Sequence, residues 1–232
     1  MKLSVIIPVY NEKHTILEIL KKVESVKDIR KQIIIVDDGS TDGSYDLINS
    51  FNFISDYKII KHEKNTGKGS CIKSAQKYVL GDIVIIQDAD LEYDPKDYKH
   101  IISFFYKKNQ KVVYGSRVLN KQRYNQKNFI SNFRILANHI LTLITNILFF
   151  QNLTDAHTCY KVFDGEIFKK ICLKENDFAF CPEITAKVSK LGFKISEVPI
   201  SYYGRNYNEG KKISFYDGIR AIFVLLKYRI FS

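Results

Sequence analysis

Two carboxylates stand two residues apart in Asp88-Ala89-Asp90, directly after an apolar run at residues 83–86. If the chain turns there, both can approach one divalent cation, and oxygen ligands suit Mg²⁺ or Mn²⁺. Such an ion would bridge diphosphate oxygens and offset the charge on a departing nucleotide. Glu92 lies two residues further on and is a candidate third ligand. Taken alone, the spacing fits equally well a turn with solvated acids.

Two other polar clusters also follow apolar runs. Residues 10–12 (Tyr-Asn-Glu) come after the run at 3–9, and Asp37-Asp38 comes after the run at 32–36. The carboxylates of Asp37 and Asp38 could accept hydrogen bonds from a base or a ribose. Alternatively, residues 38–40 form a turn and a helix cap. Both roles are compatible, with Asp37 functional and Ser40 structural.

A small glycine-rich loop, residues 65–69, precedes a helical pattern. The spacing of a GxxxxGK[ST] phosphate-binding loop is absent from it. Its backbone amides could still lie near a nucleotide, because the start of a helix favours anions. The alternative is an ordinary flexible loop.

Arginines of the second half are the natural counterpart of a phosphate. Arg117 follows an apolar run, Arg134 begins a long apolar segment, and Arg205 sits in a glycine-flanked loop. Guanidinium forks bind phosphate oxygens in bidentate fashion. Any one of these arginines, taken singly, is more often a solvated surface charge.

The pattern of apolar residues predicts the elements that position these motifs. Strands are expected at residues 3–9, 32–36, 57–62, 82–87, 112–114 and 193–200. Helices are expected at residues 12–26, 42–51, 68–80, 133–150, 167–173, 182–191 and 216–228. Alternation of apolar strands with helices indicates an α/β fold, a mainly parallel sheet covered by helices on both faces. Ligands bind beyond the carboxyl ends of such strands, where the three polar clusters should converge.

The composition bounds the class of protein. The 232 residues, 45% of them hydrophobic, fit a single domain, and the net charge of +11 suits nucleic acid, anionic lipid or phosphorylated small molecules. A generally Lys-rich surface is the simpler explanation. A nucleic-acid partner is not expected, because no zinc, helix-turn-helix or RNA-binding signature is present. The four cysteines show no CxxC pair, and no signal peptide precedes the first strand, so a cytoplasmic protein is expected.

Two amphipathic segments, residues 133–150 and 216–228, are strongly apolar but interrupted by polar residues. Neither is apolar over the ~20 residues that a membrane span needs. Each could be a buried core helix or a helix lying in a membrane interface.

With these residues assembled, the chain resembles family 2 inverting glycosyltransferases of the GT-A fold, which is Rossmann-like. Within that family it most resembles polyprenyl-phosphate (dolichyl-phosphate) mannosyltransferases. The matching segments are residues 5–12, 36–42, 65–69, 87–92 and 115–117. The tail resembles the same group more loosely, over residues 155–163, 197–200 and 205–212.

The resemblance implies a nucleotide-sugar-binding half, residues 1–117, and an acceptor-binding half, residues 118–232. It implies catalytic roles for Asp90 and Arg117, and a Mg²⁺ or Mn²⁺ ion held by Asp88, Asp90 and Glu92. The acceptor phosphate would meet Arg117, Arg134 and Arg205. The nucleotide-sugar would contact Pro8, Tyr10, Asn11, Glu12, Asp37, Lys68, Asp88, Ala89, Asp90 and Arg117.

The expected reaction moves a sugar, first of all mannose from GDP-mannose, to a polyprenyl phosphate with inversion. A phosphate acceptor is already anionic and needs little help from a base. One alternative is a sugar-hydroxyl acceptor in polysaccharide or glycolipid synthesis, with Asp155 or Glu183 as base. A second is a UDP-glucose-dependent polyprenyl-phosphate glucosyltransferase. A nucleotidyltransferase is disfavoured, because residues 8–10 replace the Lys-rich glycine loop that it would carry after the first strand.

A lipid acceptor would be reached from the membrane surface. The two amphipathic segments and the net charge of +11 suit that purpose. The expected location is therefore peripheral, on the cytoplasmic face of a membrane, with a membrane-anchoring protein as a possible partner.

Overall fold

Seven strands form one sheet in the order β3-β2-β1-β4-β6-β5-β7 in the computed structural model. The structure describes residues 1–119, 129–204 and 215–231, and the side chains of residues 129–134 and 215 fall outside that description. The pairs β1–β2, β2–β3, β1–β4 and β5–β7 are parallel, whereas β6 is antiparallel to both β4 and β5. The strands are β1 (Lys2–Val9), β2 (Arg30–Asp37), β3 (Asp56–Lys61), β4 (Ile83–Ile86), β5 (Val112–Ser116), β6 (Lys161–Asp164) and β7 (Ser196–Pro199).

The central strands are buried on both faces, which explains their nearly unbroken apolar sequences. Residues 33–36 of β2 and 83–86 of β4 are all isoleucine or valine and have at most 1% exposure. β-Branched side chains of this kind pack well on a pleated surface with layers above and below. In contrast, β3 forms one edge of the sheet and is mostly exposed.

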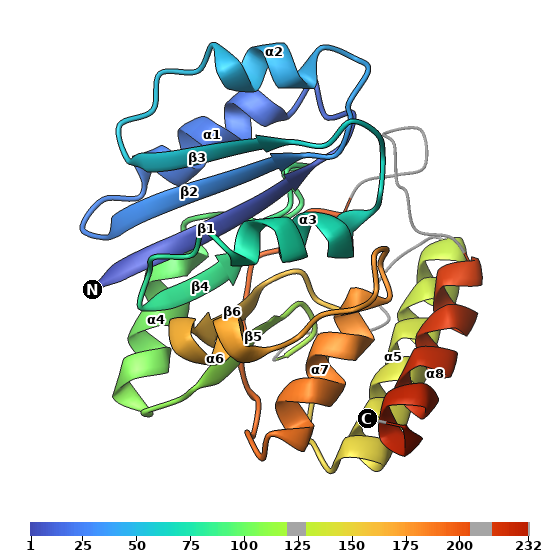
Figure 1. Ribbon diagram of the computed structural model, residues 1–232. Helices are drawn as coiled ribbons and strands as arrows, with labels where there is room; N and C mark the ends of the chain where they lie inside the picture. The colour runs from blue at the N-terminus through green and yellow to red at the C-terminus, as the bar shows by residue number, and fades with distance from the viewer. Residues whose placement is uncertain (120–128, 205–214, 232) are drawn as a thin grey trace.

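Helices cover both faces of this sheet, with α3 and α7 in front of it and α1 behind it in the view of Figure 1. In α1, apolar side chains at positions 16, 19, 20 and 23 recur at helical spacing, and all four are fully buried. The helices are α1 (Ile16–Ser25), α2 (Ser44–Asn49), α3 (Lys68–Gln76), α4 (Asp97–Lys107), α5 (Phe129–Phe149), α6 (Gly165–Lys170), α7 (Phe180–Lys190) and α8 (Phe215–Ile230).

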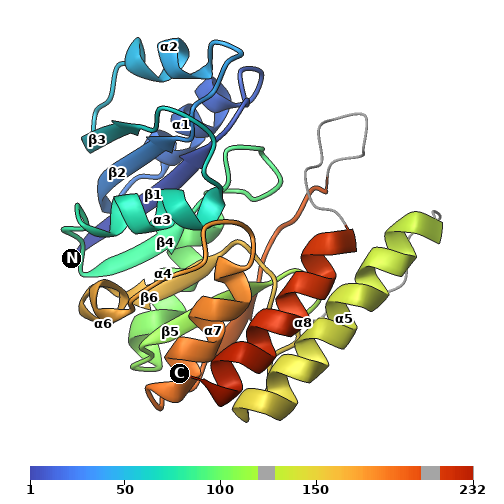
Figure 2. The ribbon, with the colours of Figure 1, turned by 45° about the vertical axis from the view of Figure 1, so that its right-hand side comes forward.

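Helices α5 and α8 lie side by side along one flank of the molecule, as Figures 1 and 2 both show. A small second core joins them to α7, through Phe149 of α5, Ala186 of α7 and Leu225 of α8. Among the described residues, none of the helices combines the length and apolar character that crossing a membrane requires.

The structure confirms the predicted α/β fold, a single domain with a mostly parallel sheet. Two elements were missed by the sequence analysis, α4 and β6. The signal for α4 was present, because Tyr98, Ile101, Ile102 and Phe105 have helical spacing and are buried. Strand β6 has only four residues, too few for a clear pattern. The predicted strand at 193–200 is shorter than expected, and the helix predicted at 133–150 begins at residue 129.

Candidate functional site

The strand order of the sheet reverses direction between β1 and β4. From β1 the chain runs outward to β2 and β3, then crosses back to place β4 on the other side of β1. The carboxyl ends of β1 and β4 therefore diverge at a topological switch point, where open α/β sheets bind ligands. Residues 10–12 follow β1, residues 37–38 lie at the end of β2, and residues 88–90 come one residue after β4. The predicted convergence of the three polar clusters at this edge is confirmed.

The Asp88-Ala89-Asp90 segment turns immediately after β4, as its proposed chemistry requires. Leu91 has a φ of 64°, and the Asp90 carboxylate accepts a hydrogen bond from the backbone N–H of Glu92 at 3.1 Å. Both aspartates stay partly exposed, while Ala89 is buried beneath them. The donor set is all oxygen and reachable from solvent, so it fits Mg²⁺ or Mn²⁺.

Lys68 contributes a positive charge to the same place. Its ammonium group donates to the Asp88 carboxylate, and the two side chains are 14% and 20% exposed. Burial by itself would lower the pKa of Lys68, but the neighbouring Asp88 outweighs it and raises that pKa. Lys68 is thus a fixed cation beside the predicted metal ligands, suited to an anionic diphosphate.

Glu92 is held differently from the two aspartates. Its carboxylate accepts a hydrogen bond from the Tyr202 hydroxyl at 2.8 Å. In the described part of the chain, the only group of three possible metal ligands within 4.8 Å of one another is Asp38, His62 and Cys71. The structure therefore does not gather Glu92 with the two aspartates into a preformed triad, and its role as a ligand stays a prediction.

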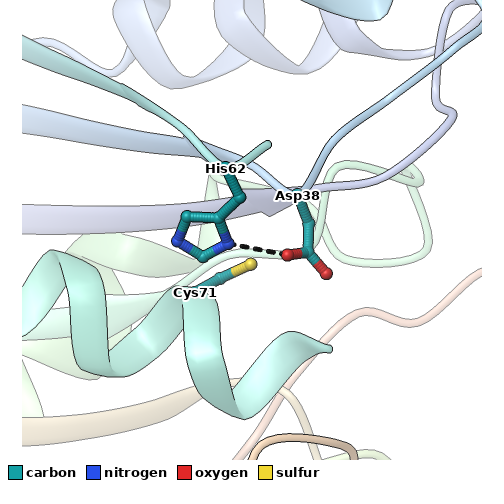
Figure 3. Close-up of side chains that lie close together, drawn as sticks. All are labelled: Asp38, His62 and Cys71. Atoms are coloured by element: carbon teal, nitrogen blue, oxygen red, sulfur yellow. Dashed lines mark hydrogen bonds and ion pairs between the residues drawn. The ribbon is translucent and has the colours of Figure 1, made fainter. Parts of the chain in front are cut away.

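In the group of Asp38, His62 and Cys71, Asp38 is hydrogen-bonded to His62 and Cys71 lies beside them (Figure 3). The Asp38 carboxylate bonds to His62 Nδ1 at 2.7 Å and accepts the backbone N–H groups of Thr66 at 3.0 Å and Gly67 at 2.7 Å. Metal binding would need a thiolate at Cys71, whereas burial and then the Asp38 charge raise the pKa of that thiol. Asp38 instead fastens the loop at residues 65–67 to the end of β2.

Asp37 keeps one acceptor atom open. Its Oδ2 atom accepts the backbone N–H of Ser40 at 3.1 Å, but its Oδ1 atom is buried without a partner in the described part of the chain. Buried polar atoms are nearly always hydrogen-bonded, so this oxygen fits a donor on a bound base or ribose. Pro8 and Tyr10, also predicted to contact the nucleotide, lie partly exposed at the neighbouring end of β1.

Asn11 and Glu12, in contrast, join the two loops at the sheet edge. The Asn11 side-chain oxygen accepts a hydrogen bond from the backbone N–H of Thr41 at 2.9 Å, and the backbone N–H of Asn11 donates to Ser40 Oγ at 3.0 Å. The Glu12 N–H donates to Ser44 Oγ at 2.9 Å. These bonds hold the loops after β1 and β2 together, so the described contacts of both residues shape the site. Direct binding of a nucleotide by either residue stays a prediction.

Most backbone amides at the start of α3 are already hydrogen-bonded. The N–H groups of Gly69 and Ser70 donate to the backbone oxygens of Asp177 at 3.3 Å and Asn176 at 2.8 Å. The Gly67 N–H is taken by Asp38. The glycine-rich loop thus contributes the side chain of Lys68 to the site rather than a row of amides.

Arg117 is committed to a buried ion pair. Its Nε and Nη2 atoms donate to the two Asp155 oxygens at 2.7 and 2.8 Å, and its guanidinium lies 5.2 Å from the Tyr202 ring centre. The guanidinium carries five N–H donors and this pair occupies only Nε and Nη2, so its roles in catalysis and in phosphate binding stay predictions. The Arg134 side chain and all of Arg205 lie outside the described residues.

The two carboxylates considered as bases are also engaged. Burial by itself would raise the pKa of Asp155, but the Arg117 charge outweighs it and lowers that pKa. The carboxylate of Glu183 is fully buried and accepts the backbone N–H groups of Lys174 at 2.6 Å and Glu175 at 2.8 Å. A carboxyl group whose pKa is lowered, as in Asp155, is a poor base near neutral pH, and the Glu183 carboxylate is closed off from solvent.

The loop before β6 adds residues that the sequence analysis did not include in the site. Cys159 Sγ lies 3.9 Å from Lys68 Nζ, and the Cys159 N–H donates to the Tyr93 hydroxyl at 3.0 Å. In the described structure, His157 Nε2 and Thr158 Oγ1 are buried without a partner. This loop reaches the site because β6 runs antiparallel beside β4, and nothing in the sequence pattern indicated that pairing.

Comparison with known proteins agrees with this geometry. A family model described as glycosyl transferase family 2 matches residues 4–172. A dolichyl-phosphate β-glucosyltransferase of Trichomonas vaginalis is 28% identical over 99% of this chain and 73% of its own length. An uncharacterized protein of Methanocaldococcus jannaschii is 27% identical over 99% of this chain and 93% of its own length.

Solved structures support the fold. Glucosyl-3-phosphoglycerate synthase from Mycobacterium tuberculosis, in complex with Mg²⁺ and UDP, superposes with a TM-score of 0.70 at 16% identity, over 98% of this chain and 79% of that one. TarS of S. aureus in complex with UDP-GlcNAc gives a TM-score of 0.59 at 18% identity, over 98% of this chain and 67% of the TarS chain.

The expected likeness to mannosyltransferases needs correction, since a second dolichyl-phosphate relative, 25% identical over 98% of this chain and 73% of its own length, is again a β-glucosyltransferase. The coarser expectation is confirmed by the match over residues 4–172 together with the GT-A neighbours. The chain belongs to glycosyl transferase family 2 and is a glycosyltransferase of the GT-A fold.

Proposed function

We propose that this enzyme transfers glucose from UDP-glucose to a polyprenyl phosphate, with inversion and with the help of a divalent metal. The relatives that are named glucosyltransferases act on dolichyl phosphate, and they match nearly the whole chain. UDP-glucose therefore replaces GDP-mannose as the first expected donor. The single observation that carries the donor side is the Lys68–Asp88–Asp90 group at the topological switch point.

The described residues divide the work on the donor. Asp37 would accept a hydrogen bond from the nucleoside through its open Oδ1 atom, and Lys68 would face the diphosphate. Mg²⁺ or Mn²⁺, held by Asp88 and Asp90, would offset the charge that builds on the leaving UDP. An acceptor phosphate oxygen would bond to the anomeric carbon as the bond to UDP breaks, which inverts that centre.

The engaged state of Asp155 and Glu183 favours a phosphate acceptor. A sugar hydroxyl must lose a proton during attack and therefore needs a base. A phosphate is already anionic at neutral pH and needs none. The pairing of Asp155 with Arg117 and the burial of Glu183 beneath α8 thus agree with the acceptor used by the glucosyltransferase relatives.

A lipid acceptor has to be met at a membrane surface, and the outer face of the α5–α8 pair suits one. Ile147 and Phe223 are about 70% exposed, at 73% and 70%. Exposed apolar side chains at helical spacing, beside basic residues, are typical of helices that lie in a lipid interface. The exposed apolar side chains on this face, here called the flank face, are Leu136, Ile140, Leu143, Ile147, Phe150, Tyr216, Ile219, Phe223, Leu226 and Ile230.

A transfer assay tests the proposal directly. The purified protein is incubated with Mn²⁺ and polyprenyl phosphate in detergent, with UDP-glucose in one arm and GDP-mannose in the other. We expect a glucosyl lipid phosphate, detected by mass spectrometry, and a β linkage from the α-linked donor. Transfer only from GDP-mannose would refute the sugar, and transfer only to free saccharides would refute the acceptor.

A further inference from the structure

The backbone at the start of α3 rests directly on residues 173–178, a segment here called the cap segment. A Cβ atom at Gly67 would lie 2.6 Å from the Asn176 backbone oxygen, and one at Gly69 would lie closer still to that of Glu175. No side chain fits between these backbones. Lys68 stands between the two glycines, so the cap segment determines where its side chain begins.

The cap segment is held on its other side by α8. The Glu175 side chain accepts hydrogen bonds from Lys227 Nζ at 2.8 Å, Arg220 Nη2 at 3.2 Å and the Tyr228 hydroxyl at 3.2 Å. Arg220 also pairs with Asp177 at 2.8 Å. Glu175 is only 8% exposed, so these bonds are partly shielded from water and gain strength from that.

Helix α8 therefore has a polar side and an exposed apolar side. Its polar residues bind the cap segment, while Ile219 and Phe223 belong to the exposed flank face. We infer that Glu175 is a positioning residue that couples docking of α8 on a lipid surface to donor binding through Lys68. The inference rests on the proposed function, because that function supplies the lipid surface.

The coupling has a simple physical source. Docking restrains α8, and through Glu175 it restrains the cap segment that supports Lys68. A donor diphosphate then orders less of the chain when it binds, so it binds more tightly. Thermodynamic linkage requires the reverse effect as well: the donor must tighten binding to the lipid by the same factor.

Nucleotide binding with and without vesicles tests this inference. Affinities of UDP, and in a parallel arm GDP, are measured by calorimetry with Mn²⁺, with and without phosphatidylglycerol–phosphatidylcholine vesicles that contain no polyprenyl phosphate. We expect vesicles to tighten nucleotide binding by about fivefold in the wild type. In Glu175→Gln we expect less than half of that gain, with binding to vesicles in the absence of nucleotide unchanged.

Glu166→Gln is the matched control, because Glu166 is an exposed glutamate paired with Lys169 on α6, far from these contacts. It should keep the full gain. Lys227→Gln breaks the same contact from the side of α8 and should also lose the gain. It replaces Glu175→Gln in the test if that variant folds poorly. The inference is overturned if vesicle-bound wild type shows unchanged nucleotide affinity, if both variants keep the gain, or if no vesicle binding occurs.

The outcome is separable from that of the proposed function, because no sugar and no acceptor are present. Intact coupling together with absent glucosyl transfer would overturn the proposed function alone. Glucosyl transfer without coupling would overturn this inference alone. Failure of both nucleotides to bind would overturn both.

Discussion

Neighbouring carboxylates in this site have opposite roles, and their partners decide which. Asp38 is saturated by His62, Thr66 and Gly67 and holds a loop, whereas Asp37 beside it keeps a buried oxygen open. Asp88 is balanced by the Lys68 ammonium. At the scale of single residues, function thus depends on which hydrogen-bond acceptors the fold leaves unused.

Replacing Asp90 by asparagine tests the metal site. Asp90→Asn should weaken Mn²⁺-dependent binding of UDP and lower transfer on the order of a hundredfold or more, because one anionic ligand is lost. Calorimetry with UDP and Mn²⁺ measures the binding. Asp82→Asn, at the exposed opposite end of β4, is the control and should behave as the wild type. Full metal-dependent binding in Asp90→Asn would remove Asp90 from the site.

His157 should make stability depend on pH. Burial, and then the charge of Lys161, lowers the pKa of His157 from 6.5 to about 4, despite an opposing effect of Asp155. The unfolded chain therefore binds a proton between pH 6.5 and 4 that the folded chain refuses, so stability falls as pH drops through that window. Above pH 6.5 both states are neutral and the effect vanishes.

The measurement is the urea midpoint from pH 7 to pH 4, in the wild type and in His157→Gln. Carboxylates contribute to both proteins, so the difference isolates the histidine. The wild type should lose more stability than the variant over this range. Parallel curves would show that His157 titrates normally.

At the scale of elements, the start of α3 is the critical junction. Its first backbone N–H groups donate to the backbone oxygens of Asn176 and Asp177, more than 100 residues away in sequence, and it presents Lys68 to Asp88. The two glycines beside Lys68 are there because backbone passes over backbone, with no room for a side chain. The start of this short helix is thus held in place by a segment that is distant in sequence.

Gly69→Ala should disturb this junction. Its new Cβ would collide with the Glu175 backbone oxygen, and we expect a loss of about 1–3 kcal/mol in the free energy of unfolding. UDP should also bind more weakly, because Lys68 shifts. Urea denaturation measures the first effect and calorimetry the second.

Gly218→Ala on α8 is the matched control for that substitution. Nothing lies within 4 Å of its added Cβ, so the free energy of unfolding should stay unchanged or rise by about 0.5–1 kcal/mol, since alanine favours helix. Equal behaviour of the two variants would contradict a tight junction at Gly69.

At the scale of the whole molecule, a continuous series of contacts links the site to the flank face. Helices α5 and α8 run together along one side, and α7 connects them to the sheet (Figure 2). The flank face gathers exposed large apolar side chains from both α5 and α8. Together with a net charge of +11, this favours contact with an anionic lipid surface.

Phe223→Ser should weaken binding to vesicles that contain phosphatidylglycerol. Burial of a phenylalanine contributes about 1.5–3 kcal/mol, so we expect a decrease of at least about tenfold in partition. Sedimentation with vesicles measures it, and added salt should weaken binding further. Leu80→Ser, an equally exposed site away from α8, is the control. Equal partition of both variants would exclude the flank face as the docking surface.

The sequence by itself determined six of the seven strands, most helices and the place of Asp88 and Asp90. Those features depend on neighbours along the chain: runs of isoleucine and valine predict buried strands, and acids after such runs lie at the sheet edge. The same logic located Asp37, whereas Lys68 was predicted from its glycine-rich loop and the family resemblance. The sequence also determined the family, because the segments that match it occur in the same order along the chain.

The tertiary structure alone decided how these residues are paired. The antiparallel β6 brings Cys159 to Lys68, Asp155 occupies Arg117, and Glu175 ties α8 to the start of α3. Each contact joins residues that lie far apart in sequence, and it depends on strand order and helix packing. Side-chain periodicity reports which face is buried but not what covers it, so these partners could not be predicted.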